Sequence, residues 1–181
     1  MKTLIVYYSL THTNELLAKE IFNRWAGDCD LYRIAETKPR STFTTFLDNV
    51  FKRTPKIVTS DLPVGLFDNY VFIAPVWMGK VATPLKAFLL MNKKEIKQYS
   101  FITLCGGIDG QRDRLVGQLN QLIGHGAEVV TELRLDGLKE NQITQIMKER
   151  SSVKLASFFK DQILDFVKNS EMVSSKEIIT A

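Results

Sequence analysis

Hydroxyl and amide side chains are concentrated in one short stretch, SLTHTN, at residues 9–14. Ser9, Thr11, Thr13 and Asn14 carry hydrogen-bonding groups there, and His12 stands among them. A single hydroxyl suffices to cap a helix, and a cap at Thr13 is the simple alternative. The unpaired N–H groups and the dipole at a helix start favour an anion, and additional donors suit a phosphate. The stretch has neither GxGxxG nor GxxxxGK[ST], so it does not support dinucleotide or triphosphate binding by those routes.

Two further loops combine glycine with groups that could lie against a planar ring. In PVWMGK, residues 75–80, a tryptophan and a methionine offer a flat apolar surface, and packing of the tryptophan under a neighbouring loop is an equal alternative. In CGGIDG, residues 105–110, paired glycines let a ligand approach the backbone, although a tight turn would use the same residues. Together the three loops predict a ligand with a phosphate at one end and a ring at the other.

The elements that must position these loops alternate between strand and helix. Apolar, β-branched and aromatic runs predict strands, and apolar residues at helical spacing predict helices. Thr83 is a candidate N-cap ahead of Pro84. The expected strands are residues 3–8, 29–35, 70–76, 99–105 and 127–135. The expected helices are residues 14–25, 42–53, 84–92, 111–125 and 140–168.

This alternation predicts the fold class and the place of the site. Five strands, each followed by a helix, give parallel βαβ units and a doubly wound α/β sandwich with a sheet covered on both faces. Ligands of such sheets bind beyond the carboxyl ends of the strands, where all three loops would lie. We expect one domain over residues 1–168 and a flexible tail over 169–181. The stretch 36–65 is less legible and carries no motif.

Composition narrows the classes of function. The chain has 24 Lys and Arg against 20 Asp and Glu, a net charge of +4, and these residues are spread rather than gathered as in a nucleic-acid-binding face. The small excess could favour an anionic substrate or an acidic partner protein. Cys29 and Cys105 form no CxxC motif, so neither a disulfide framework nor a metal site is indicated. We expect a cytoplasmic protein, since no run is long enough to span a membrane and no leader pattern opens the chain.

Two stretches resemble the flavodoxin-like FMN-binding proteins. YYSLTHTNELLAKEI is similar to their first strand, phosphate loop and first helix, and YVFIAPVWMGKVATPLKAFL is similar to their third strand, ring-flanking loop and following helix. The resemblance implies a three-layer α/β/α sandwich with a five-stranded parallel sheet in the order 2-1-3-4-5. The family usually has a glycine where this sequence has His12, so the turn must be made without that freedom.

The resemblance also implies FMN as the cofactor and a set of residues around it. The phosphate would be held by Ser9, Thr11, His12, Thr13 and Asn14. The ring would be bordered on one side by Val76, Trp77, Met78 and Gly79, and on the other by Cys105, Gly106, Gly107 and Asp109.

The implied function is redox chemistry on the flavin, with no acid or base residue assigned. The tyrosine that many carrier flavodoxins place in the third loop is absent from GGIDGQRDR, which favours reduction of a small acceptor such as a quinone with NAD(P)H. The alternatives are a one-electron carrier with a redox partner protein and, in another class, a flavin-free binding or regulatory module. A homodimer is left open.

Overall fold

A computed structural model describes residues 1–37, 55–58, 62–105, 111–135 and 157–176 of the 181-residue chain. The expected helix at residues 42–53 lies outside these ranges, as do residues 140–156 of the last expected helix. Gly106, Gly107 and Asp109 of the third loop also lie outside the described residues.

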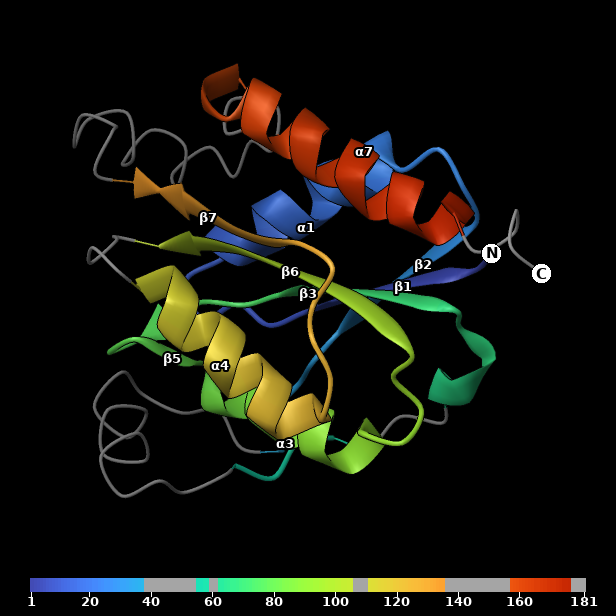
Figure 1. Ribbon diagram of the computed structural model, residues 1–181. Helices are drawn as coiled ribbons and strands as arrows, with labels where there is room; N and C mark the ends of the chain where they lie inside the picture. The colour runs from blue at the N-terminus through green and yellow to red at the C-terminus, as the bar shows by residue number, and fades with distance from the viewer. Residues whose placement is uncertain (38–54, 59–61, 106–110, 136–156, 177–181) are drawn as a thin grey trace.

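Five parallel strands form the central sheet (Figure 1). Their bounds are β1 Thr3–Tyr7, β2 Cys29–Arg33, β3 Asn69–Ile73, β6 Gln98–Cys105 and β7 Val130–Arg134. Their order is β2-β1-β3-β6-β7, which is the predicted order 2-1-3-4-5 once these five are counted along the chain. Every residue of β1 and β3 is buried, as expected of central strands made almost entirely of apolar residues.

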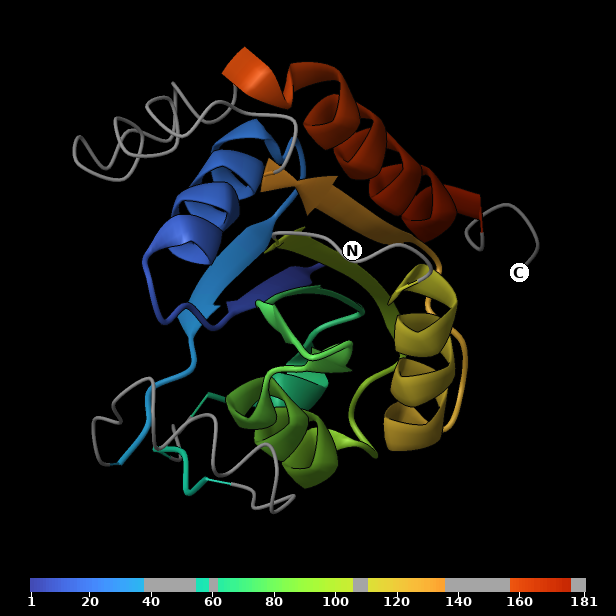
Figure 2. The ribbon, with the colours of Figure 1, turned by 90° about the vertical axis from the view of Figure 1, so that its left-hand side faces the viewer.

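Helices cover both faces of the sheet, as Figures 1 and 2 show. The helices α1 (Thr13–Arg24) and α7 (Lys160–Lys176) lie on one face, and α3 (Thr83–Asn92) and α4 (Gln111–Ile123) lie on the other. Because side chains alternate along a strand, each face has its own core. One core contains Ile5, Leu17, Ile73, Ile163 and Phe166. The other contains Phe72, Leu85, Tyr99, Phe101 and Leu119. The three-layer α/β/α sandwich is therefore confirmed.

The segment after β3 differs from the prediction. The strand ends at Ile73, and a separate hairpin follows, formed by β4 (Val76–Trp77) and β5 (Lys80–Val81) in antiparallel pairing. Pro75 has no N–H to continue the β3 ladder, and its carbonyl instead accepts a hydrogen bond from Ala82 N at 3.1 Å. The expected loop after residue 76 is thus a fixed turn.

The start of α3 corrects one expectation. Thr83 is the first helical residue and Ala82 occupies the N-cap position, with no side-chain cap. The prediction of Thr83 as the N-cap was wrong. It assumed that Pro84 is the first residue of the helix, whereas Pro84 is the second and Thr83 is the first.

The later elements shift by a few residues. β7 begins at Val130 rather than residue 127, and α4 ends at Ile123, where Gly124 with φ 103° donates its N–H to Asn120 O at 2.8 Å. Helix α7 continues to Lys176, past residue 168, and its Ser170 is buried. Within the described ranges, no helix combines the length and apolar character that crossing a bilayer requires. A short 3-10 helix, η1 (Val64–Leu66), precedes β3.

Candidate functional site

The loop between β1 and α1 turns at His12. The backbone of His12 is left-handed, with φ 65° and ψ −11°, a conformation that glycine adopts freely and other residues rarely do. Among the described residues, only His12 and Met78 are non-glycine residues with positive φ. The turn predicted to need glycine is therefore made by a histidine that takes up the glycine-like conformation.

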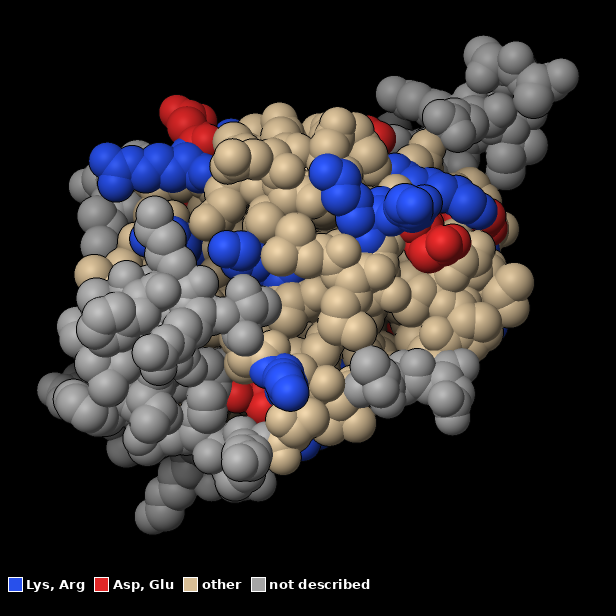
Figure 3. Space-filling view, turned by 90° about the horizontal axis from the view of Figure 1, so that it is seen from below, with Lys and Arg blue, Asp and Glu red and all other residues tan. Residues whose placement is uncertain are grey.

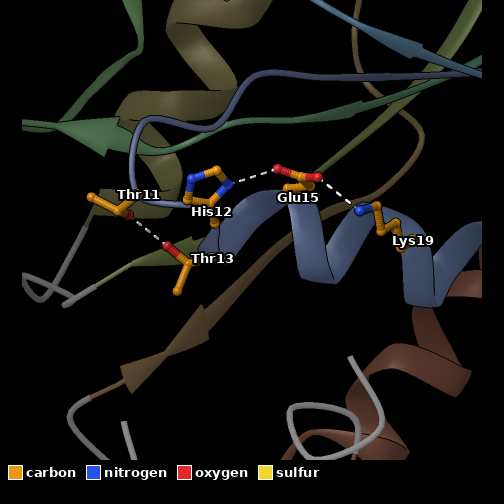
Figure 4. Close-up of polar contacts among 5 residues, drawn as sticks. All are labelled: Thr11, His12, Thr13, Glu15 and Lys19. Atoms are coloured by element: carbon orange, nitrogen blue, oxygen red, sulfur yellow. Dashed lines mark hydrogen bonds and ion pairs between the residues drawn. The ribbon is translucent and has the colours of Figure 1, made fainter. Parts of the chain in front are cut away.

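A chain of contacts between the side chains of His12, Glu15 and Lys19 holds His12 in this conformation (Figure 4). His12 Nδ1 lies 2.9 Å from Glu15 Oε2, and the Lys19 ammonium donates to Glu15 Oε1 at 2.7 Å. Two hydrogen bonds lower the pKa of the Glu15 carboxyl from 4.5 to about 2. The bond from Lys19 makes the larger contribution, and the bond with His12 makes the next largest. The contact with Glu15 thus offsets part of the backbone strain at His12.

The N-terminus of α1 has no side-chain cap. His12 makes no capping hydrogen bond, and the first helical bond runs from Leu16 N to His12 O at 3.0 Å. The N–H groups of Thr13, Asn14 and Glu15 consequently have no partner within the helix. The hydroxyls of Thr11 and Thr13 lie 2.8 Å apart beside them, as Figure 4 shows. This arrangement presents backbone donors, hydroxyls and a helix dipole to one point, as an anion site requires.

Ser9 adds an unsatisfied group to the same loop. Its Oγ is buried and has no hydrogen-bond partner. A buried hydroxyl without a partner costs free energy, and at the carboxyl edge of the sheet a polar ligand would recover this cost. The orphan hydroxyl and the uncapped helix start together fit a phosphate.

Asn14 has a different role from the other polar residues of the loop. It is 2% exposed, and both ends of its side-chain amide bind the backbone of β6: Nδ2 donates to Leu104 O at 3.3 Å, and Leu104 N donates to Oδ1 at 3.0 Å. The amide therefore ties α1 to β6, and only the backbone N–H of Asn14 faces the uncapped helix start. Cys105, the next residue of β6, is buried, and Gln111 Nε2 lies 3.9 Å from its Sγ.

The second loop is the β4–β5 hairpin, whose turn residues are Met78 and Gly79. Both have positive φ, 52° and 72°, as a two-residue type I′ turn requires. The Met78 side chain is 66% exposed at the tip, whereas Trp77 is half-buried. The hairpin is held on α4 by a hydrogen bond from Val81 N to Gln118 Oε1 at 2.8 Å.

Tyr8 connects the first two loops. Its ring meets Trp77 edge-on, with centroids 5.9 Å apart and planes at 88°. Its hydroxyl donates to Glu36 Oε1 at 2.6 Å. Tyr8, Glu36 and Gln118 were not among the predicted site residues, and the position of Tyr8 directly before SLTHTN was the one sequence signal for any of them.

A cleft of about 290 Å³ lies beside this contact, at the carboxyl ends of β1 and β2. It is lined by Tyr8, Ser9, Leu10, Arg33, Ile34, Ala35 and Glu36. Figure 2 views the same carboxyl edge of the sheet, where the loop after β1 and the hairpin after β3 both lie. The structure therefore brings together two of the three predicted loops, and Cys105 marks where the third begins. Among the described residues, no group of three or more His, Cys, Asp or Glu could hold a metal ion.

Solved structures provide the comparison. No protein-family model and no curated protein sequence matches the chain. The structure is similar to a flavoprotein from Lactobacillus acidophilus NCFM in complex with FMN, at 23% identity and a TM-score of 0.63, over 72% of this chain and 92% of that one. The apo-form of the flavoprotein from Lactobacillus acidophilus NCFM matches at 23% identity and a TM-score of 0.58, over 75% and 94%.

A flavodoxin shares nearly the whole length. This short-chain flavodoxin is associated with a non-canonical PDU bacterial microcompartment, and it matches at 13% identity and a TM-score of 0.51, over 97% of this chain and 99% of that one. The five-stranded parallel sheet in the order β2-β1-β3-β6-β7 is the order expected of this fold, and the similarity extends over most of each matched chain. The chain therefore has the flavodoxin-like fold.

Proposed function

We propose that the chain binds FMN at the carboxyl edge of the sheet and is a redox protein. The observation that carries the proposal is the uncapped start of α1, where three backbone N–H groups lack helical partners beside two hydroxyls. The FMN bound by the Lactobacillus acidophilus flavoprotein, which has the same fold, supports it. The buried Ser9 Oγ supports it as well, because a phosphate oxygen would supply the hydrogen bond that the described residues do not.

In this proposal each of the two described loops binds a different part of FMN. The phosphate is held by the hydroxyls of Thr11 and Thr13 and by the N–H groups of residues 13–15. Val76, Trp77, Met78 and Gly79 border the ring, with Tyr8 supporting Trp77 from the side. Cys105, Gly106, Gly107 and Asp109 remain the proposed residues of the third loop. FMN, when bound, supplies the redox chemistry, and the chain supplies binding, orientation and the electrostatics around the ring.

The finer function has two candidates. One is reduction of a small acceptor such as a quinone with NAD(P)H, and the other is one-electron transfer as a carrier. Mixing the FMN-loaded protein with NADH or NADPH in a stopped-flow instrument separates them. A reductase bleaches the flavin band directly, whereas a carrier stays oxidised until a separate reductase is added.

Titration with FMN and riboflavin tests the binding site, because the two ligands differ only in the phosphate. We expect the Thr11→Val/Thr13→Val variant to bind FMN about 100-fold more weakly or worse, since each of the two hydrogen bonds to a charged group contributes roughly 1.5–3 kcal/mol. Its affinity for riboflavin should be unchanged. Thr131→Val is the matched control, because Thr131 lies on β7, at the far side of the sheet from β1.

Each ligand gives a result that would overturn the proposal. A protein that is colourless after incubation with FMN and removal of the unbound flavin would be a flavin-free binding or regulatory module. Equal loss of FMN and riboflavin affinity in the threonine variant would show that the hydroxyls shape the loop and do not hold the phosphate.

A further inference from the structure

Two exposed cations lie on elements that form or contact the β4–β5 hairpin, at the edge where the proposed site lies. Lys80 follows the turn residues Met78 and Gly79, and Arg114 lies in the first turn of α4. We name Lys80 and Arg114 the basic rim. The space-filling view of the α3 and α4 side shows Lys and Arg side chains at the left-hand end, which is the carboxyl edge, and at the opposite end (Figure 3).

The geometry of α4 places Arg114 on the side of the helix that contacts the hairpin. Gln118 accepts the hydrogen bond from Val81 N, and Arg114 stands four residues before Gln118, on the same side of the helix. Lys80 is the residue next to Val81 and follows the turn that carries the exposed Met78. One cation thus comes from the hairpin itself and one from the helix face to which the hairpin is bound.

The rim is not explained by the stability of the fold. Positive charge in the first turn of a helix opposes the helix dipole, and α4 carries two arginines there against one acidic residue, Asp113. By contrast, α1 follows the rule, with Glu15 in its first turn and Arg24 in its last.

The two rim cations have no ion-pair partner among the described residues. Within the described part of the chain, no carboxylate lies within 4 Å of the charged group of Lys80 or Arg114. Arg112 is not part of the rim, because its Nε donates to Val130 O at 3.2 Å and its charge acts on the Glu132 carboxyl, so it serves the contact between α4 and β7. An exposed apolar residue with unpaired cations beside it is a typical feature of a docking surface.

We propose that the basic rim and Met78 form the docking surface for an acidic redox protein that exchanges electrons with the proposed flavin. This inference rests on the proposed function and adds the partner's charge. Complementary charge speeds encounter, and the exposed methionine supplies an adaptable apolar contact near the ring. Each partner molecule with a one-electron centre transfers one electron, so two are consumed per flavin reduced and the protons come from water.

An acidic [2Fe–2S] ferredoxin of the plant type is the probe. Reduced ferredoxin is mixed with the FMN-loaded protein, and the second-order rate constant is measured between about 20 and 500 mM salt. We expect this rate constant to fall about tenfold or more over that range. The Lys80→Glu/Arg114→Glu variant should lose at least tenfold at low salt and most of the salt dependence.

Lys93→Glu/Lys94→Glu is the matched control. Both positions are exposed and lie after the end of α3, at the opposite end of the sheet from the hairpin. Each pair of reversals replaces two positive charges with two negative ones and takes the net charge from +4 to zero, so the two variants differ in where the charge is changed. The control should stay within about twofold of the native rate constant.

A second measurement involves no electron transfer. Amide resonances of the labelled chain, with and without FMN, are titrated with oxidised ferredoxin. Residues 78–81 and 111–114 should shift or broaden in both forms, and residues 90–97 should not. Failure of FMN to bind would overturn the proposed function, while the flavin-free titration would still test the rim.

Three results would overturn the inference. The first is an equal effect of the two charge-reversal variants. The second is weaker FMN binding in the rim variant with an unchanged salt dependence, because the cations would then serve the flavin itself. The third is a rim-dependent rate with ferricyanide, a small anion, but none with ferredoxin, because the surface would then attract only small anions.

Discussion

Replacing His12 tests whether the left-handed turn exists in solution. A non-glycine residue in this conformation costs about 1–2 kcal/mol, whereas glycine there costs nothing sterically but loses about 0.5–1 kcal/mol of extra chain entropy on folding. His12→Ala retains the strain, and His12→Gly removes it, while both lose the 2.9 Å contact with Glu15. We therefore expect the glycine variant to be about 1 kcal/mol more stable than the alanine variant.

The native protein should lie close to the glycine variant. Relief of strain favours His12→Gly, and the lost contact with Glu15, about 0.5 kcal/mol for a partly exposed pair, together with the chain entropy opposes it. The net change should be within about 1 kcal/mol, measured as the free energy of unfolding in urea.

Gly117 is the matched control for this series. It lies in α4 without positive φ, and a Cβ added there would meet nothing within 4 Å. Gly117→Ala should therefore stabilise the protein by about 0.5–1 kcal/mol. At residue 117 alanine is thus expected to be more stable than glycine, whereas at residue 12 glycine is expected to be more stable than alanine. If alanine equals or exceeds glycine at residue 12, the backbone there is not left-handed and the reasoning fails.

Three further substitutions test other contacts of the site and sheet. Asn14→Ala should lower the free energy of unfolding in urea by about 2 kcal/mol, because it leaves the buried Leu104 N–H unpaired; a loss below about 0.5 kcal/mol would contradict the bridging role. Glu15→Gln should cost about 1 kcal/mol at neutral pH after allowance for solvent screening. Because the folded pKa of Glu15 is lowered from 4.5 to about 2, that difference should vanish as the pH falls through this window, and its persistence at pH 2 would refute the ion-pair origin. Thr103→Val should raise the Tm by roughly 2–4 °C, since the buried Thr103 hydroxyl has no partner, and a lower Tm would reveal a hydrogen bond there.

The strands could be predicted because burial imposes a simple pattern, whereas their order came from the resemblance to the flavodoxin-like proteins. The runs at β1 and β3 are apolar on both sides, and only a central parallel strand buries both. Element ends were less predictable. β4 and β5 have two residues each, too few for any periodicity, and their turn has methionine where asparagine or aspartate usually signals a hairpin.

The polar residues of the site could be located from sequence, but their partners could not. SLTHTN stands where a ligand loop should be, yet nothing local distinguishes Asn14 from Thr13. Asn14 differs from Thr13 because its side-chain amide binds the backbone of Leu104 on β6, which is 90 residues away in sequence. The left-handed state of His12 is likewise set by the need to join the end of β1 to the start of α1 within a few residues.

The two left-handed non-glycine residues support one interpretation of the site. Such strain persists only where the surroundings over-determine the backbone, and it clusters at ligand-binding positions. Glu15 holds His12, and the Val81–Gln118 bond holds the hairpin that carries Met78. Each of the two described loops of the proposed site thus contains one strained residue and a contact that fixes it. β1 and β3 are adjacent, and the Tyr8–Trp77 contact joins the loops that follow them. A substitution in either turn should therefore alter binding of both the phosphate and the ring of the proposed FMN.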